Sequence, residues 1–246
     1  MIKVGISGAS GRMGKVLQSV IKSYNNCTLV STLTSSSTQD DIKNACSTCD
    51  VIIDYSSPNS IKHLIQFSIL ESTNIIIGTT NLNSKHLNYI KDAAKEIAIV
   101  YAPNTSLGAN LLNIISIKIA KILRDYDTDI IEAHHRYKID APSGTALEIG
   151  QSIANAREIK FDTHVVFDRY NRSARKKDDI TISSIRAGGI YGEHEVLFTG
   201  DDEVISVNHR VLSRNTFAKG ALYAALWIIN KKPGLYSMQD VLFLDK

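Results

Sequence analysis

Three glycines near the start of the chain constrain its fold more than any other feature. Residues 7–14 read Ser-Gly-Ala-Ser-Gly-Arg-Met-Gly, which spaces Gly8, Gly11 and Gly14 three residues apart. An apolar run over residues 2–6 precedes this loop, and a stripe of helical spacing over residues 13–21 follows it. A glycine-rich turn between strand and helix lets the backbone approach a pyrophosphate, and the helix N-terminus offers it free N–H groups. The chain is therefore expected to begin with a dinucleotide-binding βαβ unit.

The pattern of the remaining residues predicts two domains. Up to residue 101, apolar strands alternate with helical stretches, which predicts a parallel sheet. Strands are expected at 2–6, 29–33, 51–54, 74–77 and 98–101, and helices at 13–21, 58–70 and 84–97. Farther on, helices are expected at 107–123, 143–157 and 215–230, and strands at 130–134, 164–167, 180–185, 195–198 and 204–207. We predict an α/β chain with a Rossmann-type parallel-sheet domain and a second α+β domain that has an open mixed sheet.

Composition and charge exclude several other classes of protein. The chain of 246 residues is 43% apolar and 22% charged, the balance of a globular protein with a sizeable core. Its net charge of +3 is too small to indicate nucleic acid or a membrane surface as the main partner. Its three cysteines, Cys27, Cys46 and Cys49, are a poor disulfide framework, and no apolar run is long enough to span a membrane. The sequence therefore predicts a reduced, soluble, cytoplasmic protein without a signal peptide.

The second predicted strand bears on the choice of cofactor. In many dinucleotide-binding folds an acidic residue about 20 positions after the glycines binds the ribose 2′-hydroxyl. Here the strand ends in hydroxyl residues over 31–37, and the first carboxylate is Asp40. Hydroxyl groups can bind a 2′-phosphate that a carboxylate would repel. Either NADH or NADPH is therefore expected to serve as cofactor.

A basic segment in the second half carries the candidate chemistry. Residues 132–146 read Glu-Ala-His-His-Arg-Tyr-Lys-Ile-Asp-Ala-Pro-Ser-Gly-Thr-Ala. His134 and His135 end a predicted strand, Lys138 follows, and a helix begins near Ser143. Cations and a helix N-terminus favour an anionic ligand, and histidine is suited to moving a proton near neutral pH. The segment therefore predicts a catalytic site for an anionic substrate.

These motifs, together with several others in the same order, resemble the 4-hydroxy-tetrahydrodipicolinate reductase (dihydrodipicolinate reductase) family over essentially the whole chain. The others are Gly78-Thr79-Thr80, Ala102-Pro103-Asn104, residues 185–194 (Ile-Arg-Ala-Gly-Gly-Ile-Tyr-Gly-Glu-His) and Ser213-Arg214 with Phe217-Ala218. The resemblance implies reduction of a cyclic dicarboxylate by hydride transfer from NADH or NADPH, in lysine and diaminopimelate biosynthesis. It also implies a homotetramer.

The resemblance further implies domain bounds and site residues. Residues 1–105 and 216–246 would form the dinucleotide-binding domain, and residues 106–215 the domain for substrate binding and oligomerisation. His134 and Lys138 would be catalytic, and His135, Ser143, Gly144 and Thr145 would bind the substrate. The cofactor would contact Gly8, Ala9, Ser10, Gly11, Arg12, Met13, Gly78, Thr79, Thr80, Ala102, Pro103, Asn104 and Thr105. No metal is expected. Residues 169–179 lack the glycines expected of the family, and their basic run is typical of a solvated surface.

Other functions stay open on the residues alone. Another Rossmann-type oxidoreductase acting on a small anion would share most of these features. Among such enzymes a semialdehyde dehydrogenase needs a cysteine nucleophile in its catalytic half, and all three cysteines lie within the first fifty residues. A nicotinamide-sensing protein without catalysis would need a partner-binding element, and we find no basic helix-turn-helix. A zinc site at Cys46 and Cys49 lacks a second pair of ligands nearby. His134 and His135 are adjacent on a predicted strand and would point to opposite faces, which argues against a joint metal site.

Overall fold

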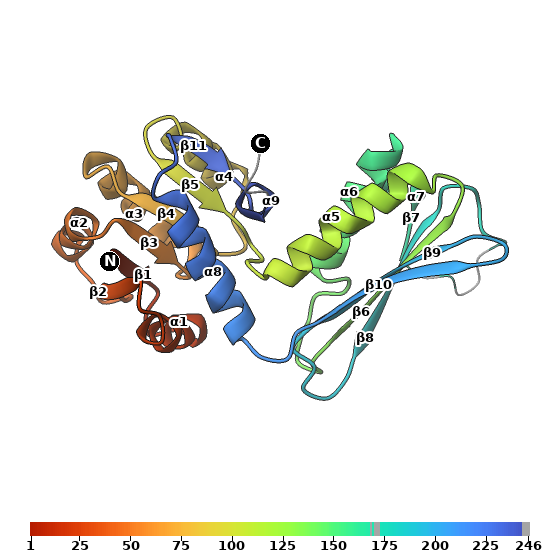
Figure 1. Ribbon diagram of the computed structural model, residues 1–246, viewed down its shortest axis with the longest axis horizontal. Helices are drawn as coiled ribbons and strands as arrows, with labels where there is room; N and C mark the ends of the chain where they lie inside the picture. Colours follow the sequence, from red (N-terminus) through yellow and green to blue (C-terminus); the bar gives the residue numbers. More distant parts are fainter. Residues whose placement is uncertain (168, 170–172, 243–246) are drawn as a thin grey trace. The chain divides into compact units, whose positions relative to one another are not determined.

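The computed structural model describes residues 1–167, 169 and 173–242. The chain divides into two compact units (Figure 1). The first comprises Met1–Leu107 and the chain from Arg214 onward, and the second comprises Gly108–Ser213. That the first unit holds the cofactor and the second the substrate stays a prediction. None of the helices in the described ranges has the length and apolar content that a bilayer span requires.

A six-stranded parallel sheet forms the centre of the first unit, with strand order β11-β5-β4-β3-β1-β2. The strands are β1 (Ile2–Ser7), β2 (Cys27–Leu33), β3 (Val51–Asp54), β4 (Asn74–Ile77), β5 (Ala98–Tyr101) and β11 (Gly234–Tyr236). The helices are α1 (Arg12–Lys22), α2 (Gln39–Thr48), α3 (Pro58–Leu70), α4 (Ser84–Ala93), α8 (Asn215–Ile228) and α9 (Met238–Leu242). This arrangement confirms the predicted Rossmann-type domain.

Helices cover both faces of this sheet because its strands are apolar on both sides (Figure 1). Successive side chains of a strand point to opposite faces, so Ile53 and Ile76 pack with α1 and α8, whereas Ile52, Ile75 and Ile77 pack with α2, α3 and α4. Because all six strands are parallel, their carboxyl ends meet at one edge of the sheet. This edge carries the loops that the sequence assigned to the cofactor.

The second unit is built on a mixed five-stranded sheet of order β10-β9-β6-β8-β7, as the sequence predicted for this domain. Its strands are β6 (Asp127–His134), β7 (Val165–Val166), β8 (Ile180–Arg186), β9 (Glu193–Thr199) and β10 (Val204–Arg210). Its helices are α5 (Leu107–Ile122), α6 (Gly144–Arg157) and α7 (Phe161–His164). The apolar sides of α5 and α6 pack on one face, against Ile130, Ile182 and Phe198. No helix in the described part of this unit packs on the opposite face, where Ile185 and Val204 are about half exposed.

Several elements differ from the sequence prediction, each for a local reason. Helix α2 was missed because its sequence is mostly polar; the missed signal is a capping box, in which Thr38 Oγ1 accepts from the Asp41 amide and the Asp41 carboxylate accepts from the Thr38 amide. Helix α4 ends at Ala93, not at residue 97. Residues 94–96 form a turn that leads to the buried Ile97, whose apolar side chain continued the helical spacing in the sequence. The strand predicted at 164–167 begins one residue later, since His164 closes α7.

The basic run of residues 169–179 is not simply a solvated surface. Arg175 forms ion pairs with Asp127 at 3.0 Å and Asp129 at 2.9 Å, and donates to the Thr128 carbonyl at 2.7 Å. The prediction was wrong for Arg175 because the first residues of β6 include two aspartates that pair with it. Residues 170–172 of the run lie outside the described residues.

Candidate active site

The glycine loop joins β1 to α1 in a conformation that side chains would prevent. Gly8 has φ +83°, and a Cβ there would lie 2.4 Å from the Tyr55 carbonyl oxygen. Gly14 is buried in the first turn of α1, where a Cβ would lie 2.3 Å from the Gly8 carbonyl oxygen. Gly11 is the N-cap of α1, and no side chain caps the helix there. The loop therefore leaves the helix N-terminus open to an anion.

A cavity of about 380 Å³ lies against this loop. It is bordered by Gly8 and Gly11, by hydroxyl residues after β2, and by Tyr55 and His63. None of the described residues that border it is acidic. The residues therefore fit a dinucleotide, and no carboxylate there would repel a 2′-phosphate.

The other predicted cofactor residues follow β4 and β5 at the same edge of the sheet. Two of their hydroxyl groups are already engaged within the protein. Thr79 Oγ1 donates to the buried Asp54 carboxylate at 2.6 Å, and Thr105 Oγ1 donates to the Phe217 carbonyl at 2.7 Å. Burial raises the pKa of Asp54, although hydrogen bonds from Ser56, Thr79 and Ser7 oppose this. The hydroxyl hydrogens of these two buried threonines thus bind within the protein, whereas Thr80 is exposed.

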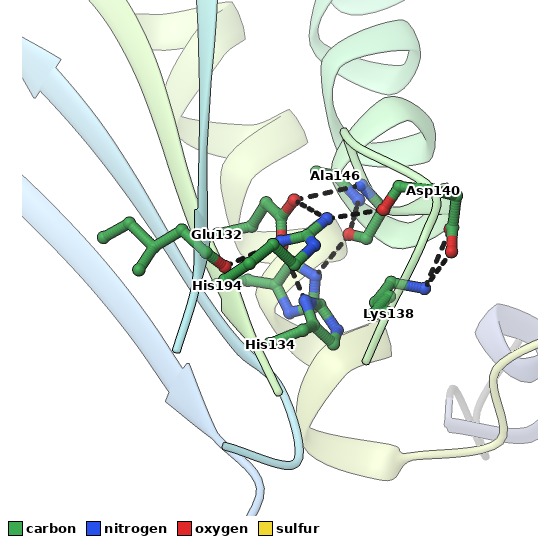
Figure 2. A network of polar contacts seen from close by, with 9 residues as sticks. Glu132, His134, Lys138, Asp140, Ala146 and His194 are labelled. Carbon is green, nitrogen blue, oxygen red and sulfur yellow. Dashed lines mark hydrogen bonds and ion pairs between the residues drawn. The ribbon is translucent and has the colours of Figure 1, made fainter. Parts of the chain in front are cut away.

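In the second unit, Glu132 is the centre of a buried polar cluster on β6 (Figure 2). Its Oε2 lies 2.5 Å from His134 Nδ1, and Arg186 donates to both of its oxygens, at 2.9 and 2.7 Å. Burial alone would raise the pKa of Glu132, but hydrogen bonds from His134, Arg186 and Ser184 hold this pKa well below its usual range. Glu132 is therefore an ionised carboxylate, surrounded by donors.

Ser143 links this cluster to the start of α6. Its amide donates to Glu132 Oε1 at 3.2 Å, and its Oγ accepts from the Ala146 amide at 3.2 Å as the N-cap of α6. The same Oγ lies 3.0 Å from Nε2 of His194. Burial, together with the nearby His134, lowers the pKa of His194 to about 3. His194 is therefore neutral near physiological pH.

The remaining predicted residues lie on the turn after β6 and at the first turn of α6. The strand ends at His134, so His135 begins the turn, and within the described part of the chain no hydrogen bond reaches its buried Nδ1. Lys138 Nζ donates to both oxygens of Asp140, at 2.9 and 2.8 Å. Gly144 is exposed with open space around it, and Thr145 is half-buried. An anion could reach α6 from this side.

The structure thus links three of the six predicted catalytic and substrate residues in one polar network: His134 and Ser143 both contact Glu132, and Lys138 is joined through Asp140 to Arg186. His135, Gly144 and Thr145 lie beside it in the chain, and the network adds other residues. Glu132, Asp140, Arg186 and His194 were not assigned roles from the sequence. Spacing could have indicated Glu132, because residues two apart on a strand share a face. Arg186 and His194 are placed by strand pairing, opposite His134 and Glu132 respectively.

Comparisons with known proteins agree along the whole chain. The family model "Dihydrodipicolinate reductase, N-terminus" matches residues 2–105, and "Dihydrodipicolinate reductase, C-terminus" matches residues 108–242. Proteins named 4-hydroxy-tetrahydrodipicolinate reductase are similar to it: that of Rickettsia akari is 42% identical over 98% of this chain and 96% of its own, and that of Rickettsia canadensis is 41% identical over 98% of each. A solved structure, "Dipicolinate bound Dihydrodipicolinate reductase from Paenisporosarcina sp. TG-14", shares the fold, with a TM-score of 0.81 at 23% identity over 98% of this chain and 100% of that chain.

Proposed function

Because the chain belongs to the dihydrodipicolinate reductase family, it is an NAD(P)H-dependent oxidoreductase that reduces 4-hydroxy-tetrahydrodipicolinate in lysine biosynthesis, and we propose the roles that its residues take in this reaction. One observation carries the assignment of these roles. An imidazole, held by an ionised carboxylate, lies beside a helix N-terminus and several cations in the second unit. Such a site can both bind carboxylates and move a proton.

The cofactor is assigned to the first unit. Gly8, Ala9, Ser10, Gly11, Arg12 and Met13 contact its pyrophosphate at the start of α1. The amides of Gly8, Ala9 and Gly11 donate within the protein, so the amides of Ser10, Arg12 and Met13 bind the anion. Residues 78–80 and 102–105 approach it from the carboxyl ends of β4 and β5. The reduced nicotinamide, when bound, supplies the hydride.

The substrate carboxylates are assigned to the turn after β6 and the start of α6. His135, Gly144 and Thr145 bind them, because they offer an imidazole, exposed backbone amides and a hydroxyl at a helix N-terminus. Ser143 has its amide and hydroxyl engaged within the protein, so its contribution is to fix the first turn of the helix. The Paenisporosarcina reductase binds dipicolinate, a ring with two carboxylates, which supports this substrate class.

The protons are assigned to His134 and Lys138. The 4-hydroxyl leaves as water to give a conjugated ring. Hydride addition to a carbon of this ring then leaves negative charge on the conjugated system, and a neighbouring atom takes a proton. His134 Nε2 exchanges that proton, since Nδ1 is held by Glu132. The hydrogen bond from Lys138 lowers the pKa of Asp140, so Asp140 stays ionised and orients Lys138 Nζ, the second proposed donor.

An absorbance assay of cofactor oxidation tests this function directly. With enzymatically generated substrate, both NADH and NADPH are expected to be oxidised. Their kcat/KM values should lie within about tenfold, or about 1.4 kcal/mol of transition-state binding, because the cavity beside the glycine loop has hydroxyls where an acid would discriminate. Turnover with neither cofactor would refute the function, and a preference for NADH of several hundredfold would refute the role of the hydroxyls.

The assembly is assigned to the face of the second sheet opposite α5 and α6. Ile131 and Leu197 lie on this face with the half-exposed Ile185 and Val204, among polar side chains such as Asp129 and Glu195, and the face can bury these apolar side chains against a second copy of the chain. We infer that the homotetramer assembles through this face. Light scattering should give about four times the chain mass of 27.1 kDa, and Leu197→Lys should lower it. A monomeric wild-type protein would contradict this assignment.

The enzyme is assigned to the cytoplasm. Cys27, Cys46 and Cys49 are all free and buried, an arrangement that a reducing compartment preserves.

A further inference from the structure

We propose that Glu132 is a positioning residue that fixes the tautomer and the orientation of His134, and that Arg186 holds Glu132 in place for this task. The inference rests on the proposed role of His134 as a proton carrier and adds to it the residues that prepare the imidazole. Glu132 and Arg186 lie behind His134 and are assigned no contact with the substrate.

Strand pairing brings the three side chains together. Glu132 and His134 are two residues apart on β6 and share a face, and Arg186 of β8 is directly opposite His134 in the parallel ladder. The carboxylate is fully buried, so it must be paired to stay ionised. Arg186 supplies this pairing with one nitrogen on each oxygen. Arg186 alone thus balances the negative charge of Glu132, without a charge on His134.

The contact with His134 therefore has a consequence beyond charge balance. An ionised carboxylate only accepts hydrogen bonds, so the ring nitrogen 2.5 Å from Oε2 carries the proton. The neutral ring is then protonated at Nδ1, and Nε2 is the atom that gains and loses a proton. In a Ser-His-Asp triad the aspartate likewise accepts from Nδ1–H of the histidine and so holds the ring in its reactive tautomer.

The surroundings of Nε2 agree with this assignment. A Cβ on Gly192 would lie 3.1 Å from Nε2, so the absence of a side chain there keeps this side of the ring uncrowded. The ring of His194 packs edge-on against that of His134, with centroids 5.3 Å apart (Figure 2). Since His194 is neutral, it does not repel a protonated His134. Neither Gly192 nor His194 carries a charge, so among these neighbours only Glu132 stabilises a protonated His134.

The test begins with the wild-type enzyme. Nitrogen-15 NMR of the histidine rings, assigned with His134→Gln, should show neutral His134 protonated at Nδ1. This measurement needs neither substrate nor activity, so it remains informative even if His134→Gln keeps full activity and the proposed catalytic role fails. Finding neutral His134 protonated at Nε2 would overturn the inference.

The variant Glu132→Gln then tests the consequence. A glutamine can turn its amide donor toward Nδ1, which favours the tautomer protonated at Nε2. We expect kcat to fall by about 10²–10⁴-fold, KM to change by less than about threefold, and the His134 signals to shift to the other tautomer. A fall in kcat without a change of tautomer would show a merely structural role and overturn the inference, as would an unchanged kcat.

Two further variants separate positioning from stability. Asp129→Asn is the matched control, because it also removes a carboxylate partner of an arginine from β6, at the far end of the strand from His134; its kcat should stay within about twofold. If Glu132→Gln fails to fold because Arg186 loses its partner, the double variant Glu132→Gln with Arg186→Gln removes both charges together. It should fold and show the same loss of kcat and the same change of tautomer, and wild-type values of either would overturn the inference.

Discussion

Replacing His134 with glutamine should lower kcat by about 10²–10⁴-fold, the usual contribution of general acid–base catalysis. Glutamine keeps a polar side chain of similar length but cannot exchange a proton near neutral pH. Lys138→Ala should cause a loss of the same order, because it removes the second proposed donor. Initial-rate kinetics over a range of substrate concentrations would separate kcat from KM in each variant.

Thr145→Val is the matched comparison for these two variants. It removes a hydroxyl that is proposed to touch a substrate carboxylate in both the ground state and the transition state, so it should raise KM and leave kcat nearly unchanged. Asp140→Asn keeps the lysine and removes only its ion pair, so it shows how much of the Lys138→Ala effect comes from the pair. If the His134 and Lys138 variants keep near-normal kcat and only bind substrate poorly, these side chains form a carboxylate clamp and the proton comes from water.

Gly14→Ala should weaken cofactor binding strongly. The added Cβ would lie 2.3 Å from the Gly8 carbonyl oxygen and 2.6 Å from the Ala9 Cα, both backbone atoms of the loop that is proposed to hold the pyrophosphate. Because backbone atoms cannot rotate away, the loop must shift. We expect the Kd of NADH to rise by about 10²-fold, equal to about 2.8 kcal/mol. The free energy of unfolding should fall by about 1–3 kcal/mol, as for other overpacked sites.

Fluorescence titration of NADH and urea unfolding would measure the two effects. Gly189→Ala is the control, since a Cβ there would meet nothing within 4 Å, and it should change neither quantity appreciably. If Gly14→Ala binds NADH normally, the loop can shift away from α1 without weakening NADH binding, and the proposed pyrophosphate contact is wrong.

The sequence predicted best where local rules decide the structure. The glycine loop, the buried strands and the long helices depend on residues near one another in the chain, so their spacing was sufficient. It failed at α2, where polar residues hide the helix and only the capping box of Thr38 and Asp41 marks its start. It also failed at α4, whose apolar spacing continues to Ile97 although the backbone has already turned. In both cases packing on the sheet overrides the pattern of the segment.

The sequence by itself determined the class of the fold and the family, and it picked out the segments proposed to carry the chemistry, because a strand, a glycine turn and a helix N-terminus are local structures. Only the tertiary structure decided which side chains serve one another. Glu132 and Arg186 are 54 residues apart, and their contact depends on the register of two parallel strands. The hydroxyls of Thr79 and Thr105 likewise turn to Asp54 and Phe217, partners that packing alone supplies. A hydrogen bond is sensitive to a few tenths of an ångström, and such distances between remote segments are set only when the whole sheet is assembled.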